Sequence, residues 1–333
     1  MNSLQSKYKV VLFLIHTSSG RGGGITTYCN ALYDLFYNSN RFDVSIYPFF
    51  PTATPLGNKY DINKLKEFVD KEKPDILHIN GYTSLIVSQI VPFANKNGLK
   101  VVYTPHWHPF YTMRLSKLKQ IHFGLFVKPY LKYIKGIVCI NKEESTFFKK
   151  ISQTYVDLIP HWYKKIPSND SQVKRVTNRI LFIGNLFYGN KGFDFLYNLP
   201  EGKYDIHCVG RGVRQLRSDM TQHIDISESE LSDLFYSSSL VVIPSRYEAF
   251  SYVALEALTH GTPVLVSDNV RISDYISNLA ACNIYRYGDK ENFITKVSET
   301  IGNKFVVAEV ISPFSKEKAL KSYTDFYLRA LSQ

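Results

Sequence analysis

Short apolar runs alternate with amphipathic stretches along nearly the whole chain. The first half contains six runs and the second half four: KVVLFLI, FDVSIYPF, DILHIN, KVVYTP, GIVCIN and YVDLIP, then RILFIG, YDIHCVG, SLVVIP and TPVLVS. Strands made of continuous Val, Ile and Leu are typical of parallel sheets that helices cover on both faces. The pattern therefore predicts an α/β chain with doubly wound, Rossmann-like sheets.

The length of 333 residues indicates two domains, since a single hydrophobic core rarely grows that large. A polar stretch without apolar periodicity, YKKIPSNDSQVKRVTNR, begins at residue 163 and has a linker composition. We predict a first domain over 1–165, a linker over 166–177 and a second domain over 178–314. The two would face each other across a cleft at the carboxyl ends of their strands.

The last segment, 315–333, has a helical pattern, and we expect it to pack back on the first domain. One broad apolar face carries Ala319, Tyr323, Phe326, Tyr327 and Ala330.

Composition narrows the location of the protein. The sequence contains no run of eighteen apolar residues, so we expect no membrane span. The apolar run KVVLFLI is better interpreted as a buried strand than as a signal peptide. The cysteines, Cys29, Cys139, Cys208 and Cys282, show no paired spacing, which suits buried thiols in a reducing cytoplasm.

The formal charge of +11 is unevenly distributed. Through residue 165 there are 22 Lys and Arg against 10 Asp and Glu, a net of +12. Within this half, residues 114–136 contain no acid, and Lys128, Lys132 and Lys135 have helical spacing. We expect these lysines to meet an anionic membrane surface, although a solvated helix face with core aromatics has the same pattern.

Two loops that follow first-half strands carry candidate chemistry. HTSSGRGGGITTY, residues 16–28, places Gly23 and Gly24 before a helix whose free N–H groups suit an anion, although a flexible turn is the alternative. TPHWHPFY places His106 and His108 at a strand end, where a histidine can contact a substrate hydroxyl or phosphate. A third metal ligand is not evident nearby, and a structural histidine remains the competing interpretation.

In the second half, IGNLFYGNKGFDFL places Lys191 after a strand, and PSRYEAFSYVALEAL places Glu248 in a turn and Glu256 in the helix that follows. The helix amino terminus and Lys191 favour negative charge. Ionised carboxylates beside an anion site make sense when they accept hydrogen bonds from vicinal hydroxyls. A nucleotide-sugar, which has a diphosphate between two sugars, would use the anion site for its diphosphate and one carboxylate for each sugar. The alternative is a helix with one dipole-related Glu and one exposed Glu.

The chain resembles the large family of retaining GT-B glycosyltransferases, family 4-like, that carries an E-x7-E signature. The resemblance runs in order through GGGITTY, TPHWHPFY, IGNLFYGNKG, VGRG, ELSDLFYSSSLVVIPSRYEAFSYVALEAL and HGTPVLVS. It implies that Glu248 touches the transferred sugar, that Glu256 binds the ribose and that His106 lies by the reacting sugar. It further implies a donor-binding set made of Gly23, Gly24, Lys191, Ala249, Phe250 and Ser251.

Three positions depart from the family pattern. Asn185 stands where an Arg is usual, and Arg211 or Arg246 are candidates to replace its charge at the phosphate. The sequence Ala249-Phe250-Ser251 replaces GFG, and IPHW replaces IPNG. These changes affect donor affinity or donor identity rather than the fold.

The sequence therefore predicts a glycosyltransferase that moves a hexose from a UDP- or GDP-linked donor to a cell-surface glycan or lipid-linked acceptor. We expect no other cofactor, no nucleic acid and, because no Asp-x-Asp occurs, no metal. The expected location is the cytoplasm, peripheral on the inner face of the cell membrane. The alternatives are a non-catalytic nucleotide-sugar-binding or scaffold subunit and a GT-B sugar-nucleotide epimerase.

Overall fold

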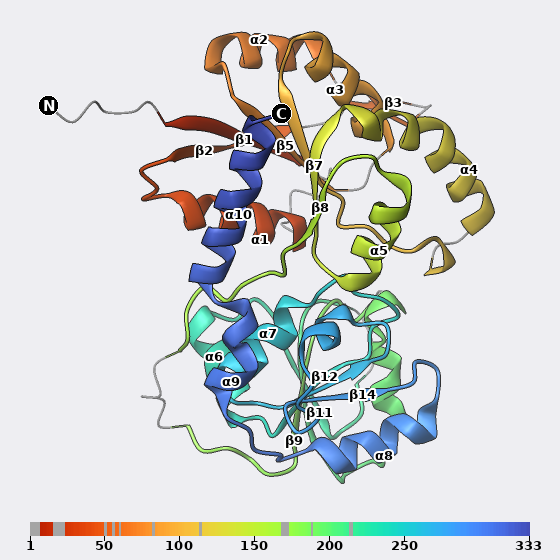
Figure 1. The fold of residues 1–333 in the computed structure, drawn as a ribbon. Helices are drawn as coiled ribbons and strands as arrows, with labels where there is room; N and C mark the ends of the chain where they lie inside the picture. The colour runs from red at the N-terminus through yellow and green to blue at the C-terminus, as the bar shows by residue number, and fades with distance from the viewer. Residues whose placement is uncertain are drawn as a thin grey trace, which may run out of the picture. The chain divides into compact units, whose positions relative to one another are not determined.

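The structure is a computed structural model that describes ten segments of the chain. They are residues 7–15, 24–49, 52–54, 57–59, 61–81, 84–112, 115–167, 173–187, 189–212 and 216–333. The chain divides into two compact units, Met1–His161 with Lys316–Gln333, and Trp162–Ser315 (Figure 1). The expected linker over 166–177 falls within the second unit, and its residues 168–172 lie outside the described segments.

The first unit is built on a parallel sheet with the strand order β2-β1-β5-β6-β7-β8. Its strands, which match the six apolar runs predicted from the sequence, are β1 (Tyr8–Ile15), β2 (Phe42–Phe49), β5 (Ile76–Asn80), β6 (Lys100–Thr104), β7 (Ile134–Cys139) and β8 (Val156–Leu158). The remaining elements are α1 (Gly24–Phe36), α2 (Ile62–Glu72), α3 (Ser84–Lys96), α4 (Ser116–Phe126), α5 (Lys142–Ile151), the 3₁₀ helices η1 (Phe110–Thr112) and η2 (Lys128–Tyr133), and the antiparallel pair β3 (Thr52–Thr54) and β4 (Gly57–Lys59).

The C-terminal helix α10 (Lys316–Leu331) belongs to this first unit. Its buried residues are Ala319, Tyr323, Phe326, Tyr327 and Ala330, the apolar face that the sequence predicts. The helix contacts α1, β6 and β7 and thereby covers the sheet with residues that lie far away in sequence.

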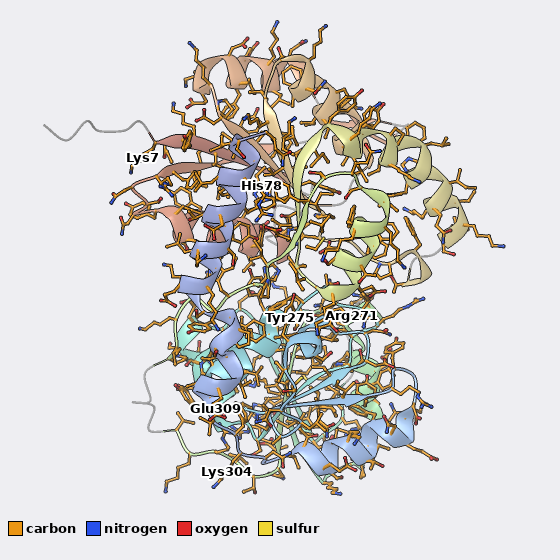
Figure 2. All side chains as sticks on the ribbon, in the orientation of Figure 1. Lys7, His78, Arg271, Tyr275, Lys304 and Glu309 are labelled. Carbon is orange, nitrogen blue, oxygen red and sulfur yellow. The ribbon has the colours of Figure 1, made fainter. Side chains whose placement is uncertain are left out.

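A buried polar network anchors α10 to β5, β6 and α1. His78, labelled in Figure 2, places Nδ1 2.8 Å from the Tyr327 hydroxyl and Nε2 2.8 Å from Oγ1 of Thr104. The hydroxyls of Tyr28 and Tyr323 lie 2.6 Å apart. Burial, assisted by nearby His106, lowers the pKa of His78 to about 3, so its neutral ring bridges two hydroxyls.

The second unit has the strand order β11-β10-β9-β12-β13-β14, again all parallel. The strands are β9 (Arg179–Ile183), β10 (Asp205–Val209), β11 (Met220–His223), β12 (Leu240–Ile243), β13 (Val264–Ser267) and β14 (Cys282–Tyr285). The helices are η3 (Gly189–Lys191), η4 (Phe193–Asn198), α6 (Glu228–Ser237), α7 (Tyr252–Thr259), η5 (Arg271–Tyr275), α8 (Lys290–Thr300), α9 (Val307–Ile311) and η6 (Ser312–Phe314). Strand order reverses between β9 and β12, and α/β sheets bind ligands beside such a reversal.

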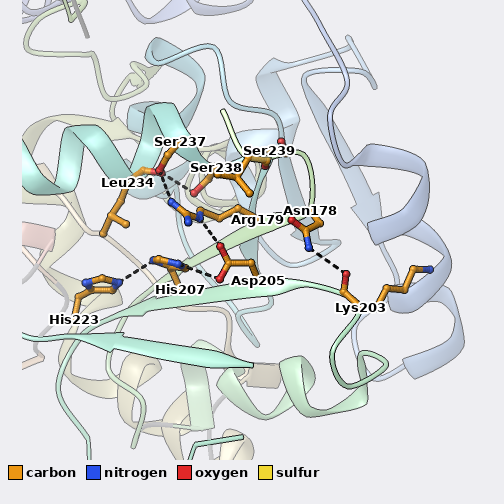
Figure 3. Close-up of polar contacts among 11 residues, drawn as sticks. Asn178, Arg179, Lys203, Asp205, His207, His223, Leu234, Ser237, Ser238 and Ser239 are labelled. Carbon is orange, nitrogen blue, oxygen red and sulfur yellow. Dashed lines mark hydrogen bonds and ion pairs between the residues drawn. The ribbon is translucent and has the colours of Figure 1, made fainter. Parts of the chain in front are cut away.

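Polar contacts tie β9, β10, β11 and α6 together (Figure 3). Arg179 Nε donates to Asp205 Oδ2 at 2.8 Å, and Asp205 Oδ1 lies 3.2 Å from His207 Nε2. His207 Nδ1 is 2.9 Å from His223 Nε2. Burial, and then the charge of Arg179, lowers the pKa of His207, which keeps its ring neutral and able to bridge. Because Arg179 and Asp205 begin β9 and β10, we assign this cluster a structural role at the edge opposite to the ligand-binding one.

The predicted stripe of three lysines on one helix is wrong. Lys128, Lys132 and Lys135 do not share a helix, since η2 ends at Tyr133 and Lys135 lies in β7. The chain becomes extended at Ile134, which is buried in the core at the start of β7. Lys191 ends η3, and the next residue, Gly192, is the left-handed N-cap of η4, so a 3₁₀ helix begins directly after this Lys-Gly pair.

Candidate active site

The turn between β12 and α7 is held in place by the loop after β13. Glu248 pairs with Val270 in an isolated parallel bridge. Its N–H donates to the Asn269 carbonyl at 3.1 Å, and its carbonyl accepts from the Arg271 N–H at 3.0 Å. The backbone of Glu248 therefore has a fixed position at the carboxyl edge of the sheet.

Lys191 and Glu248 form an ion pair at this edge. The Lys191 Nζ lies 2.7 Å from Glu248 Oε1, and Oγ of Ser245 donates to the same oxygen at 2.7 Å. The side chains of Lys191 and Glu248 are 36% and 14% exposed, so the pair is reachable from solvent. Residues that the sequence assigns to phosphate and to sugar thus meet each other across the strand-order reversal.

Close packing of two main chains brings Lys191 to Glu248. Gly192 has a φ of +69°, and a Cβ on it would lie 1.9 Å from the carbonyl oxygen of Pro244. The Arg246 N–H donates to the Asn190 carbonyl at 2.8 Å, and Asn190 Nδ2 donates to the Tyr247 carbonyl at 3.3 Å. The loops after β9 and β12 are therefore joined backbone to backbone.

The start of α7 is a strained turn. Ser251 is the N-cap, with its side chain accepting from the Ala254 N–H at 3.3 Å, and it has a φ of 122°. Such a conformation is rare outside glycine, and it is maintained where the surroundings enforce it. Phe250 provides that constraint, since its buried ring packs against Phe314 with centroids 5.6 Å apart. Ala249 precedes it and is half-buried.

Glu256 lies on the exposed side of α7, one turn after the strained cap. Desolvation by surrounding protein raises the pKa of its carboxyl, and the positive charge of Lys164 opposes the rise. The carboxyl reaches solvent while protein atoms crowd it, so it is available to a ligand.

The three candidate phosphate residues have different positions. Asn185 closes its own loop, since Oδ1 accepts from the Phe187 N–H at 2.8 Å. Arg211 is paired with Asp225 through two contacts on the surface. Arg246 is exposed in the same turn as Glu248, which makes it the better placed of the two arginines.

In the first unit, Gly24 begins α1 and a Cβ there would meet nothing within 4 Å, whereas Gly23 lies outside the described residues. His106 follows β6 with a φ of +47°, again unusual for a side-chain-bearing residue. The Tyr28 ring stands edge-on to it, with centroids 4.7 Å apart, and His161 stacks at 6.0 Å.

The Nε2 atom of His106 is buried and has no hydrogen-bond partner among the described residues. Burial, with a smaller effect of His108, lowers the pKa of His106 to about 3. The imidazole is therefore neutral near neutral pH, and its free nitrogen can exchange one hydrogen bond with a ligand. Sequence reasoning missed two further polar groups, Ser245 in the turn after β12 and Glu144 in α5, because neither belongs to a recognisable spacing.

Comparisons with known proteins identify the activity class. Residues 9–162 match the family "Glycosyltransferase Family 4", and residues 177–303 match "Glycosyl transferases group 1". The chain is a glycosyltransferase of the GT-B type.

Individual relatives are distant. An uncharacterized 41.2 kDa protein in the cps region of Klebsiella pneumoniae is 26% identical over 292 residues, covering 77% of this chain and 79% of that protein. Sucrose-phosphate synthase from Thermosynechococcus elongatus has the same fold with a TM-score of 0.76 at 16% identity, covering 98% of this chain and 100% of its own.

Two further structures share this GT-B fold. The lipopolysaccharide outer core galactosyltransferase WaaB, in its apo form, has a TM-score of 0.67 at 15% identity, covering 95% of this chain and 98% of its own. HepE of Anabaena, in complex with UDP and glucose, has a TM-score of 0.68 at 13% identity, covering 96% and 99%.

The contact between the two main chains predicts a test of how the glycosyltransferase positions Lys191. Gly192→Ala should lower the unfolding midpoint of the second unit, because the left-handed backbone alone costs a side-chain-bearing residue about 1–2 kcal/mol and the Pro244 carbonyl must also move. Gly189→Ala is the matched control, since a Cβ there meets nothing within 4 Å. Thermal unfolding of both variants checks this, and equal midpoints would contradict the packing argument.

Proposed function

We propose that this glycosyltransferase moves a hexose from a UDP- or GDP-linked donor to a hydroxyl of a cell-surface glycan or lipid-linked acceptor. Transfer proceeds with retention and without a divalent metal. One observation carries the proposal: a lysine ammonium and a glutamate carboxylate meet, with Nζ and Oε1 2.7 Å apart, beside the strand-order reversal of the second sheet. Such a site offers one group for a diphosphate and another for a sugar.

The diphosphate would lie on Lys191 and on the amides of Ala249, Phe250 and Ser251. A lysine has three N–H donors, and only one is needed for Glu248. The amides precede α7, where the helix amino terminus adds positive potential. Arg246, exposed in the same turn, supplies a further positive charge in place of the arginine that Asn185 replaces.

The two glutamates would hold the two sugars of the donor. Both hydrogen bonds of the Glu248 carboxylate fall on Oε1, so within the described part of the chain Oε2 is left for a hydroxyl of the transferred hexose. Glu256, exposed on α7, would accept from the ribose hydroxyls. Carboxylates form strong, charge-assisted hydrogen bonds with hydroxyls.

The first unit would contribute His106 and the glycine loop at Gly23 and Gly24. A neutral imidazole with a free Nε2 suits a hydrogen bond to a sugar hydroxyl near the reacting carbon. In the retaining reaction, the leaving phosphate itself takes the proton of the acceptor hydroxyl. The protein then stabilises the developing charge and holds the reactants in place.

The proposed partners follow from the similar proteins. HepE is described with UDP and glucose, and WaaB is a lipopolysaccharide outer core galactosyltransferase. These names favour a nucleotide-sugar donor and a surface-glycan acceptor for this chain. A scaffold subunit would bind donor without transfer, and an epimerase would return an isomerised nucleotide-sugar; product analysis by mass spectrometry separates both from a transferase.

Glu248→Ala and Glu256→Ala should each reduce kcat/KM by about tenfold to more than a hundredfold, since a hydrogen bond to a charged group contributes about 1.5–3 kcal/mol. Glu309→Ala, an exposed glutamate of the same unit labelled in Figure 2, is the matched control and should be silent. Steady-state kinetics on variants with unchanged circular dichroism decide the matter. Near-wild-type values of kcat/KM in both Glu248→Ala and Glu256→Ala would contradict the assignment of these glutamates to the donor site.

Because Lys191 and the α7 amides supply the positive field, we expect full transfer activity in excess EDTA. Initial rates before and after exhaustive chelation measure this. Activity that EDTA abolishes and Mn²⁺ or Mg²⁺ restores would refute metal independence.

We also propose that the first unit docks on an anionic membrane through α4. Leu118, Ile121 and Leu125 are 60%, 60% and 64% exposed, and their spacing places them on one helix face. Phe123 is buried on the opposite side, so the exposed face is not needed for the core. No helix in the described part of the chain is long and apolar enough to cross a bilayer.

Positive charge surrounds this apolar face. Lys117, Lys119, Lys128 and Lys132 are exposed on α4 and η2, and residues 114–136 contain no acid. Tyr130 and Tyr133 pack against the core instead, so the apolar contact belongs to α4. An apolar stripe between lysines is suited to the headgroup boundary of an anionic leaflet, which would place the enzyme at the inner face of the cell membrane.

Co-sedimentation with vesicles tests the docking surface. Binding should require anionic lipid, weaken at high salt, and fall in a Lys119→Ser, Lys128→Ser, Lys132→Ser variant, because each lysine near the surface contributes about 1 kcal/mol. Lys135 is left intact because it is half-buried in β7. Lys64, Lys66 and Lys71, exposed on α2, provide a control variant of equal charge. Equal binding to neutral vesicles, or none to anionic ones, would overturn the proposal.

A further inference from the structure

Glu144 is a fully buried carboxylate. It is the third residue of α5, and its N–H donates to the side chain of the N-cap Asn141 at 2.8 Å. No ion pair joins it to any of the described residues, although burying an unpaired charge is costly.

Its two carboxylate oxygens accept from two different main-chain segments. Oε2 accepts from the Ile140 N–H at 2.8 Å, which helps to cap α5. Oε1 accepts from the Trp107 N–H at 2.8 Å, in the loop after β6. Capping explains one of these bonds but not the second, which reaches 37 residues back along the chain.

The second bond falls on the peptide that follows His106, the residue with a φ of +47°. The same helix also holds the neighbouring ring, since Trp107 stacks on Phe147 with centroids 4.3 Å apart and planes 12° apart. The α5 helix therefore fixes both the backbone and the side chain next to the strained histidine.

We propose that Glu144 is a positioning residue that fixes the left-handed backbone of His106 and so aims its free Nε2 at the ligand. The proposal rests on the function proposed above only for the identity of that ligand. Ionised Glu144 accepts both amides. When one oxygen carries a proton, that oxygen becomes a donor, and one of the two buried N–H groups loses its acceptor.

The surroundings of Glu144 place this change near neutral pH. Burial raises its pKa to about 7, and the bonds from Trp107 and Ile140 oppose the rise. The titratable groups around it are Tyr28 of α1 and Cys139 of β7, whose own pKa values burial raises, and His106 and His108 beside Trp107. On its own helix, Lys142 and Glu143 precede it. Tyr28 and Cys139 are therefore uncharged near neutral pH.

A fluorescence titration tests the inference without any substrate. The chain has two tryptophans, so Trp162→Phe leaves Trp107 as the sole reporter. Its emission should change with a midpoint near pH 7, and adding Glu144→Gln should abolish the change, because the amide has only one acceptor oxygen at every pH. Adding His108→Gln to the Trp162→Phe variant should leave the fluorescence change in place. So should adding Glu143→Gln, the matched control at the neighbouring residue.

Kinetics provide the second measurement. Glu144→Gln should lower kcat about tenfold with little change in the donor KM, and should remove the acid limb of the kcat profile near pH 7. Glu144→Asp should keep a titrating limb, while its shorter reach leaves kcat reduced.

A fluorescence change that persists in Glu144→Gln, or disappears in His108→Gln, would overturn the inference whether or not the protein transfers sugar. If Glu144→Gln does not fold, the fluorescence titrations of Trp162→Phe with and without His108→Gln test the inference: a change near pH 7 that persists without His108 supports it, and one that disappears overturns it.

Discussion

The contact between the Gly192 backbone and the Pro244 carbonyl is the constraint on which the candidate active site depends. A Cβ at residue 192 would lie 1.9 Å from that oxygen, so the loops after β9 and β12 can approach this closely only with glycine at this position. A similar contact joins the loop after β10 to the loop after β9, since a Cβ on Gly210 would lie 1.9 Å from the Gly184 carbonyl oxygen. The ends of β9, β10 and β12 are thereby fixed relative to one another. This fixed arrangement brings the Lys191 ammonium to the Glu248 carboxylate.

Strain appears in both units at loops that follow strands. His106 and Ser251 have φ values of 47° and 122°, conformations that side-chain-bearing residues rarely adopt, although Lys73, Leu115 and Asp225 also have positive φ values. In each case neighbouring groups over-determine the backbone: Glu144 and Phe147 beside His106, and the buried Phe250 beside Ser251. Strain that the surroundings enforce is typical of functional sites.

The apolar runs were sufficient to predict the two parallel sheets, because buried strands require continuous Val, Ile and Leu. The sequence missed β11 and β14, whose residues, MTQH and CNIY, are short and partly polar because both strands lie at sheet edges. The motif spacing predicted Glu248 and Glu256, since eight residues span one turn and the helix behind it. The spacing did not predict that Lys191 would pair with Glu248 or that Glu144 would reach Trp107. Those contacts join positions 57 and 37 residues apart, and they depend on which strands become neighbours.

Buried titratable groups in the first unit connect its stability to its chemistry. Burial lowers the pKa values of His78 and His106 to about 3, so the unfolded chain binds protons that the folded one does not, and this stability is lost as pH falls from about 6.5 toward 3. Glu144 behaves oppositely: its raised pKa means that its contribution is largest at low pH and is lost as pH rises from about 4.5 to about 7. Above that range the histidines are neutral and Glu144 is ionised. Ionisation of Glu144 above that range therefore lowers the stability of the folded unit relative to its value at low pH, and the remaining core compensates for this loss.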